Sequence, residues 1–333
     1  MSPTLCEYPT VPSPPAPSGG QGGRRPDESS DAPRTPGQRA WQRFRRNRPA
    51  VLAGIFLAVV VAATVLIPTV SHFDSDHGSD SQFSPPGWQH WLGTDVHGRD
   101  LWVRTFSGAR ISLLVGSVGA GVSLLIGVLW GMVAGYRGGR LDSVMMRAVD
   151  VLYSMPGIVF VIVLITTLEG HLARLFELIS PRLGNSARLV FLFAGLGAVS
   201  WLTMARIVRG QVITLRNSPF ILASRALGAD TRRMLLHHVL PNISGIVIVY
   251  LCLTIPSIIL YESFLSYLGL GIRPPQASLG TLIAEGASQI NSVRVYWWLL
   301  AGPGILLAST LLALNFLGDG LRDALDPKSG GRG

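Results

Sequence analysis

Residues 206–241 read RIVRGQVITLRNSPFILASRALGADTRRMLLHHVLP and lie between two long hydrophobic runs. The stretch is basic and only half apolar, which is typical of a docking surface outside a membrane. Pro219 suits the first turn of a helix, and residues 220–227 repeat apolar residues at helical spacing. Gly228 then supplies a C-terminal turn. This part of the stretch predicts a short amphipathic helix.

A second short helix is predicted directly after the first. Asp230 and Thr231 can cap its start, and its apolar residues continue to Val239. Pro241 is expected to stop it. The stretch therefore predicts an elbow, in which two short helices meet at a fixed angle.

The composition indicates an integral membrane protein. Hydrophobic residues make up 48% of the 333 residues, charged residues only 14%, and the mean hydropathy is +0.39. A single soluble core does not need so much apolar sequence, so repeated membrane spans are expected. The formal charge of +9 is almost all arginine, since Lys328 is the only lysine. These arginines flank apolar runs and do not share one solvated face, which argues against nucleic-acid binding.

Six apolar segments are each long enough to cross about 30 Å of hydrocarbon. They are residues 51–70, 111–136, 149–168, 189–208, 243–262 and 298–318. We therefore predict an all-α integral membrane protein with six transmembrane helices in one domain, residues 51–320.

The distribution of basic residues predicts the orientation. One side collects 20 of the 28 Lys and Arg residues, with Arg206 counted at the membrane edge. Because positively charged loops stay inside, both termini and the loop 207–242 are expected in the cytoplasm of a cell-membrane protein. The first outer loop fits this orientation, as it carries five aspartates against three arginines.

The two ends of the chain differ from the apolar domain. Residues 1–38 are rich in Pro, Gly and Arg and predict a disordered cytoplasmic tail. In residues 39–50, Trp41 and Phe44 alternate with arginines. This pattern suits a basic interfacial segment on anionic lipid, or a solvated run that only sets the topology. Residues 321–333 are expected to form a cytoplasmic C-terminal tail.

Small and helix-breaking residues recur inside the predicted spans. Gly127, Gly131 and Gly135 are spaced by four residues, and small residues at this spacing allow close helix packing in lipid. Pro156–Gly157, Pro256 and 302–304 are each expected to interrupt a span. Such breaks occur along translocation paths, or are kinks that serve packing alone.

The chain lacks the motifs of a self-contained enzyme. A P-loop needs Gly-Lys-Ser/Thr, and the only lysine follows a proline. The sequence has no HExxH motif, no G-x-S-x-G elbow and no pair of carboxylates within a span. Asp150 and Glu262 lie at span boundaries, where Asp150, near Arg147, is expected to form an exposed pair or a cap. A channel or secondary transporter would carry ionisable groups inside its spans, and here they are expected at the edges.

Histidine and cysteine give little support to a metal site. His72, His77, His90 and His97 share the first outer loop with aspartates, but without the regular spacing of ligands. A solvated loop is the favoured interpretation. Cys6 lies in the N-terminal tail and Cys252 lies inside an apolar run. The two cysteines therefore predict neither a metal site nor a disulfide framework.

Several blocks of sequence resemble the permease subunits of binding-protein-dependent ABC importers, in the branch that handles dipeptides, oligopeptides and nickel. The resemblance covers about residues 40–330 and is strongest to the second, C-type permease. It rests on HWLGTDVHGRDLWVRTFSGARISLLVG (90–116), AGYRGGRLDSVMMRAVDVLYSMPG (134–157), VRGQV (208–212), SFLSYLGLGIRPP (263–275) and LGDGLRDALDP (317–327).

The resemblance assigns a role to the elbow. The family signature of Glu-Ala-Ala, three residues, Gly, nine residues, Ile, one residue and Leu-Pro falls here with its spacing intact, but Leu222 replaces Glu, Ser224 replaces Ala and His238 replaces Ile. In the family this element is the coupling helix of the permease, which fits into a groove on the ATPase subunit. The implied ATPase-contacting residues are Leu222, Ala223, Ser224, Arg225, Gly228, Ala229 and Asp230.

The resemblance also implies a function and partners. The chain would be a type I ABC importer permease that forms a path for di- or oligopeptides, with nickel or a metal chelate as the alternative cargo. It would pair with a homologous permease, two ATPase subunits and an external binding protein, and lie in membrane lipid. ATP and magnesium would bind the ATPases, so this chain is expected to hold no cofactor and to be no enzyme. Neither the substrate-binding residues nor the substrate follows from the sequence.

Overall fold

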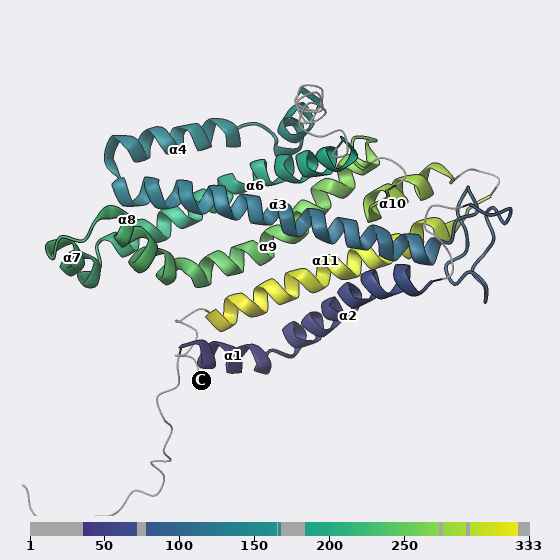
Figure 1. Cartoon of the computed structure of the whole chain (residues 1–333), viewed down its shortest axis with the longest axis horizontal. Helices are drawn as coiled ribbons and strands as arrows, with labels where there is room; N and C mark the ends of the chain where they lie inside the picture. Colours follow the sequence, from purple (N-terminus) through teal and green to yellow (C-terminus); the bar gives the residue numbers. More distant parts are fainter. Residues whose placement is uncertain are drawn as a thin grey trace, which may run out of the picture.

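The computed structural model describes residues 36–71, 78–164, 166–167, 184–272, 276–290 and 294–325, with side chains of α6 described from residue 195. The named elements of these residues are all helices (Figure 1), and one isolated β-bridge joins Thr94 and Asp100 in the loop before α3. The elements are α1 (Pro36–Arg46), α2 (Arg48–Val70), α3 (Leu101–Arg137), α4 (Gly139–Tyr153), α6 (Gly184–Arg216), α7 (Pro219–Ala226), α8 (Thr231–Arg233), the π-helix η2 (Met234–Val239), α9 (Leu240–Tyr267), α10 (Leu279–Ser288) and α11 (Trp297–Leu325).

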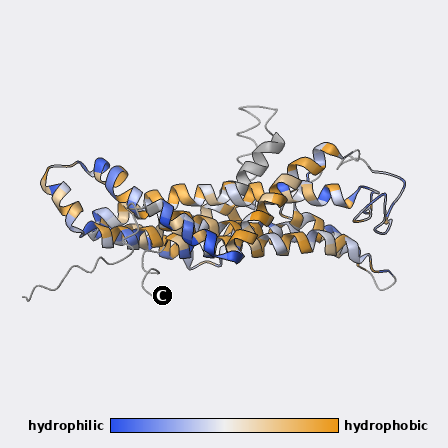
Figure 2. Cartoon of the chain, turned by 90° about the horizontal axis from the view of Figure 1, so that it is seen from below, coloured by the Kyte–Doolittle hydropathy of each residue, from blue (hydrophilic) through white to orange (hydrophobic). Residues whose placement is uncertain are grey.

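Long apolar helices run side by side along one axis of the molecule. Within the described residues, four are long and apolar enough to cross a membrane: α2, α3, the continuous helix Thr231–Tyr267, and α11. A fifth is possible if α4 and the bent segment Gly157–Leu164 together make one span. Hydrophobic residues fill the middle of the bundle and hydrophilic residues gather at its ends (Figure 2).

The third predicted span, 149–168, is not a straight helix. Its first part belongs to α4, which ends at Tyr153. After a short break that contains Pro156, the helical segment Gly157–Leu164 runs at 89° to α4. Proline lacks an N–H and disfavours helix in the residue before it, so the break at Pro156 follows from the sequence. By contrast, Pro256 and Pro303 lie inside the continuous helices α9 and α11, and our expectation that they interrupt a span was wrong. Both prolines are buried, so neighbouring helices hold them in place.

Helix α3 packs most extensively against α6, through glycines that bring the two backbones together. A Cβ atom added at Gly127 would lie 2.9 Å from the carbonyl oxygen of Trp201. At Gly131 the same atom would lie 2.5 Å from the carbonyl oxygen of Ala205, and at Gly135 it would lie 2.9 Å from that of Arg209. Small side chains allow this approach, which replaces the hydrophobic drive that lipid does not supply.

The N-terminal helix begins earlier than expected. Residues 36–38 were assigned to the tail, but α1 starts at Pro36 and packs against the end of α11. Trp41 stacks on Phe44 at a centroid distance of 6.0 Å and remains mostly exposed. Asn47 then caps α2 by accepting from the backbone N–H of Ala50 at 3.3 Å. The predicted tail before residue 36 lies outside the described residues.

Candidate functional site

The elbow at one end of the bundle begins with α7, which projects from the long helices (Figure 1). Pro219 occupies its first turn, as predicted, and the Ser218 hydroxyl donates to the Leu215 carbonyl oxygen at 2.6 Å. Ile221 is fully buried, in one hydrophobic cluster with Met234 and Val239. This single anchoring side chain holds α7 on the bundle and leaves its other faces free.

The first helix of the elbow ends in a Schellman motif. Gly228 has φ of +80°, and its N–H donates to the Arg225 carbonyl oxygen at 3.0 Å. The N–H of Ala229 donates to the Ser224 carbonyl oxygen at 3.1 Å. These are the two hydrogen bonds of the motif, and the positive φ explains the glycine.

The second helix of the elbow does not stop at Pro241. The Asp230 side chain caps it by accepting from the Arg232 N–H at 3.3 Å, but the chain then passes through η2 directly into α9. A proline ring clashes with the carbonyl four residues earlier, and the wider π turn relieves that clash. Asn242 Nδ2 also donates to the His238 carbonyl oxygen at 2.7 Å. The second helix of the elbow is thus the first part of a 37-residue helix, Thr231–Tyr267.

The elbow exposes large apolar side chains to solvent. Leu227 is 89% exposed, Leu222 49% and Phe220 43%. The Arg225 guanidinium lies over the Tyr136 ring, 5.2 Å from its centroid. Of the residues that the family signature singles out, five are exposed and two are partly buried: Leu222, Ala223, Arg225, Gly228 and Asp230 are exposed, and Ser224 and Ala229 are partly buried.

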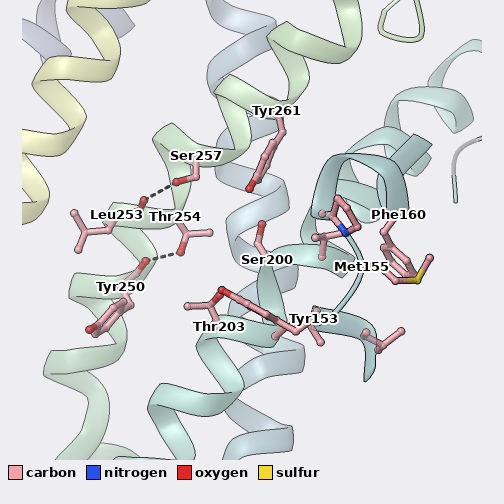
Figure 3. A pocket seen from close by; sticks show the side chains of 15 residues that line it. Tyr153, Met155, Phe160, Ser200, Thr203, Tyr250, Leu253, Thr254, Ser257 and Tyr261 are labelled. Carbon is pink, nitrogen blue, oxygen red and sulfur yellow. Dashed lines mark hydrogen bonds between the residues drawn. The ribbon is translucent and has the colours of Figure 1, made fainter. Parts of the chain in front are cut away.

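A cavity of about 460 Å³ lies between the end of α4, the segment after Pro156, α6 and α9 (Figure 3). None of the 15 side chains that line it carries a charge at neutral pH. We call it the hydroxyl cavity, since seven of its lining residues bear hydroxyl groups: Tyr153, Ser200, Thr203, Tyr250, Thr254, Ser257 and Tyr261. In Figure 3, Tyr261 and Ser200 face each other across it, and Tyr153 lies beside Thr203.

Sequence reasoning missed the hydroxyl cavity, although a signal for it exists. Within the apolar helix α9, residues 250, 254, 257 and 261 are all hydroxyl-bearing and recur at helical spacing. They therefore share one face of that helix. The break at Pro156 supplies the opposite wall, and only the fold brings α6 between them.

An ion pair lies beside the hydroxyl cavity. Asp150 was expected to form an exposed pair or a cap near Arg147, and it does form an exposed pair, but with a residue of another helix: its Oδ1 accepts from Arg206 Nη2 of α6 at 2.7 Å. The same guanidinium lies over the Tyr153 ring, 4.2 Å from its centroid. The two charges compensate each other, because α4 folds back along α6 and brings the carboxylate within reach.

The opposite end of the bundle carries a buried ionic cluster. Arg104 is only 4% exposed and contacts Asp95 and, at 2.8 Å, Glu285 of α10. Burial raises the pKa of Asp95, but the backbone N–H of Arg99 and the guanidinium groups of Arg104 and Arg99 lower it by more, so the pKa lies below its usual range. The cluster ties the loop before α3 and α10 to the start of α3.

Glu262 is fully buried within α9, which continues to Tyr267, and α10 covers it. Ser266 donates to its carboxylate at 2.7 Å and Ser112 of α3 at 3.3 Å. Ser278, the N-cap of α10, lies 3.5 Å from Ser266. A buried carboxylate held by hydroxyls from separate helices fixes how α3, α9 and α10 meet.

The predicted histidine loop is only partly described. His90 Nδ1 lies 2.8 Å from Asp100 Oδ2, while His72 and His77 fall outside the described residues. In the described part of the chain, no three His, Cys, Asp or Glu residues are grouped so that they could hold a metal ion.

Comparison with known proteins gives consistent matches. The family model "Binding-protein-dependent transport system inner membrane component" matches residues 127–330, and the "N-terminal TM domain of oligopeptide transport permease C" matches residues 35–86. The chain is 41% identical to the oligopeptide transport system permease protein OppC of Bacillus subtilis over 290 residues, which is 87% of this chain and 88% of that protein. Identity is 43% to OppC of Haemophilus influenzae (88% and 90% covered) and 43% to the dipeptide transport system permease protein DppC of Bacillus subtilis (87% and 85% covered).

Proposed function

This chain belongs to the family of binding-protein-dependent transport system inner membrane components, and from this premise we propose that it is the C-type permease subunit of an ATP-driven importer of di- or oligopeptides. Its named relatives are oligopeptide and dipeptide permeases, which supports the choice of cargo. The observation that carries the mechanism is the continuity of one helix: Thr231–Tyr267 begins in the exposed elbow and ends beyond the wall of the hydroxyl cavity.

The elbow is the proposed contact with the ATPases. Exposed apolar side chains on a short helix that is anchored by Ile221 suit insertion into a groove of a partner. Leu222, which replaces the glutamate of the family signature, is one of these exposed side chains, so the proposed contact at this position would be apolar and not an ion pair. ATP and magnesium would bind to the partner subunits, and ATP hydrolysis would take place there.

Movement of the elbow is proposed to open the path to one side of the membrane at a time. When the ATPases close, they displace α7 and with it the helix that lines the hydroxyl cavity. The bundle then tips from an inward-open to an outward-open state, which receives cargo from the external binding protein. The two states differ in how the elbow contacts the ATPases, and only such a difference can shift the equilibrium between them.

The proposed architecture is the type I importer fold with six transmembrane helices. Four spans, or five with the bent pair, are apolar enough within the described residues, and α6 would complete the set. The homologous second permease would lie against the open side of the hydroxyl cavity, and both termini would lie in the cytoplasm.

Uptake by cells of the source organism tests this function. A strain that lacks only this chain is expected to lose ATP-dependent uptake of radiolabelled trialanine, and the wild-type chain is expected to restore it. Complementation with a chain whose α7 residues 220–227 are replaced by Gly-Ser repeats of equal length is expected to fail, although the protein still reaches the membrane. Normal trialanine uptake by the deletion strain, with uptake of another solute class lost instead, would refute peptide import.

A further inference from the structure

We propose that the hydroxyl cavity holds a passing peptide through its main-chain amides, so that this chain's part of the path does not distinguish peptides by side-chain charge. The inference rests on the proposed function and goes beyond it, because it assigns a binding site and the chemical groups that this site recognises.

The lining of the hydroxyl cavity has no fixed charge with which to select cargo. Its 15 lining residues include neither acidic nor basic side chains. The ion pair beside it is internally compensated, since Arg206 Nη2 lies 2.7 Å from Asp150 Oδ1. A lone charge in a low-dielectric site would favour cargo of opposite sign and repel cargo of like sign. A lining without charge treats both alike.

The hydroxyl groups can instead satisfy a peptide backbone. In the described part of the chain, the hydroxyls of Tyr153, Thr203 and Tyr261 make no hydrogen bond, and they come from α4, α6 and α9 respectively. Two further hydroxyls, of Ser200 and Thr254, donate to carbonyls of their own helices at 3.2 and 2.6 Å and keep their oxygens as acceptors.

A hydroxyl both donates and accepts, so it can pair with either the N–H or the C=O of an amide. Every peptide presents these two groups at regular intervals, whatever its side chains. The hydroxyls on opposite walls therefore match the one feature that all peptide cargo shares. A volume of about 460 Å³ is also within the range of about 300–1,000 Å³ that small-molecule sites occupy.

The apolar part of the lining accommodates variable side chains. Met155 and Phe160 follow the end of α4, and Leu253 lies between the hydroxyl-bearing residues of α9. These side chains offer apolar surface without hydrogen-bonding groups, and the flexible methionine can fit differently shaped partners. Cargo side chains would thus meet adaptable surface while the backbone meets hydroxyls.

The test compares three tripeptides in cells that carry the complete transporter: trialanine, Ala-Lys-Ala and Ala-Glu-Ala. The variant is Thr203→Val with Tyr261→Phe, which removes two hydroxyls and keeps the volume. Initial uptake at subsaturating peptide is expected to fall about tenfold, as for two lost hydrogen bonds, and by the same factor for all three peptides. Thr214→Val with Tyr267→Phe makes the same chemical changes on the same two helices outside the cavity, and its uptake should equal that of the wild type.

Three results would count against the inference, and they separate it from the proposed function. Unchanged uptake by the variant would show that the hydroxyls do not bind cargo. Loss for the acidic or the basic peptide alone would show that the site reads side chains. If the wild-type chain imports none of the three peptides, the proposed function itself fails. The amount of each variant in the membrane, measured on a blot, shows whether it folds.

Discussion

At the scale of single residues, the direction of the elbow depends most on Gly228. Its φ of +80° is strained for any residue with a Cβ atom, although no atom would lie within 4 Å of that Cβ. The strain is therefore in the backbone and not in the packing. Only a change in the direction of the chain can relieve it, and that change would move α7.

We expect Gly228→Val to abolish peptide uptake while the protein still inserts into the membrane. A β-branched residue at positive φ costs about 1–2 kcal/mol or more, which the two Schellman hydrogen bonds cannot offset at an exposed turn. Uptake assays and membrane blots measure the two quantities. Gly210→Val is the control, because Gly210 also has open space around its Cβ position but lies within a helix. Normal uptake by Gly228→Val would rule out the coupling role of the elbow.

At the scale of elements, the contact between α3 and α6 depends on the absence of side chains along one stripe. The stripe places the α6 carbonyl oxygens where Cβ atoms of α3 would otherwise lie. Any larger residue must push the two helices apart along their length, because a helix backbone cannot yield locally. The wall that α6 gives to the hydroxyl cavity would shift with it.

Gly131→Leu is therefore expected to lower the thermal stability of the purified protein by several degrees, with a cost of about 1–3 kcal/mol from overpacking. Its Cβ would lie 2.5 Å from the Ala205 carbonyl oxygen. Thermal unfolding in detergent measures the effect. The matched control is Gly121→Leu on the same helix, where nothing lies within 4 Å of the Cβ position. Equal melting temperatures for the two variants would contradict the close approach.

The ionic cluster at the outer end predicts a pH dependence. The pKa of Asp95 is lower in the folded protein than in the unfolded chain, so its ionised carboxylate stabilises the fold above about pH 4, and this contribution is lost as the pH falls further through the folded value. Wild-type melting temperatures should drop steeply below about pH 4. Asp95→Asn should be less stable at neutral pH and show a shallower drop in acid, whereas Asp80→Asn, at an exposed position, should follow the wild type. Parallel curves for Asp95→Asn and the wild type would argue against the cluster.

At the scale of the whole molecule, the prediction concerns orientation. In a Cys6→Ser, Cys252→Ser background, a membrane-impermeant maleimide should label Ser81→Cys in intact cells. Ser143→Cys should react only after the cells are opened, because α4 follows an inner loop in the proposed topology. Both serines are exposed in the structure, so access decides the outcome. Labelling in the reverse order would invert the proposed topology.

Much of this molecule could be predicted from local sequence rules. The cap at Pro219, the turn at Gly228 and the start at Asp230 obey rules that involve a few neighbouring residues, and the structure confirms all three. The small-residue stripe is likewise a matter of spacing, and it lies where α3 meets α6.

The errors arose where distant elements decide. Local rules predict that Pro241 ends the helix. In the structure a π turn accommodates the proline, and the chain continues without a break into α9. The burial of Glu262 does not follow from its neighbours in the sequence, because α10, which covers it, is short and lies further along the chain. The partner of Asp150 belongs to another helix altogether. Each of these depends on tertiary packing, which a single sequence does not display.

The π turn at Met234–Val239 has a further consequence for how force reaches the cavity. From Thr231 to Tyr261 the helix is about 45 Å long at 1.5 Å per residue, so a tilt of about 5° displaces one end by about 4 Å. Thr231–Tyr267 is one unbroken helix in the described chain. Each residue of an α-helix rotates the chain by about 100° about the helix axis. The wider π turn changes this rotation, so it sets the direction, around the axis of α9, in which α7 projects. The same six residues that accommodate a proline therefore set the direction of the elbow.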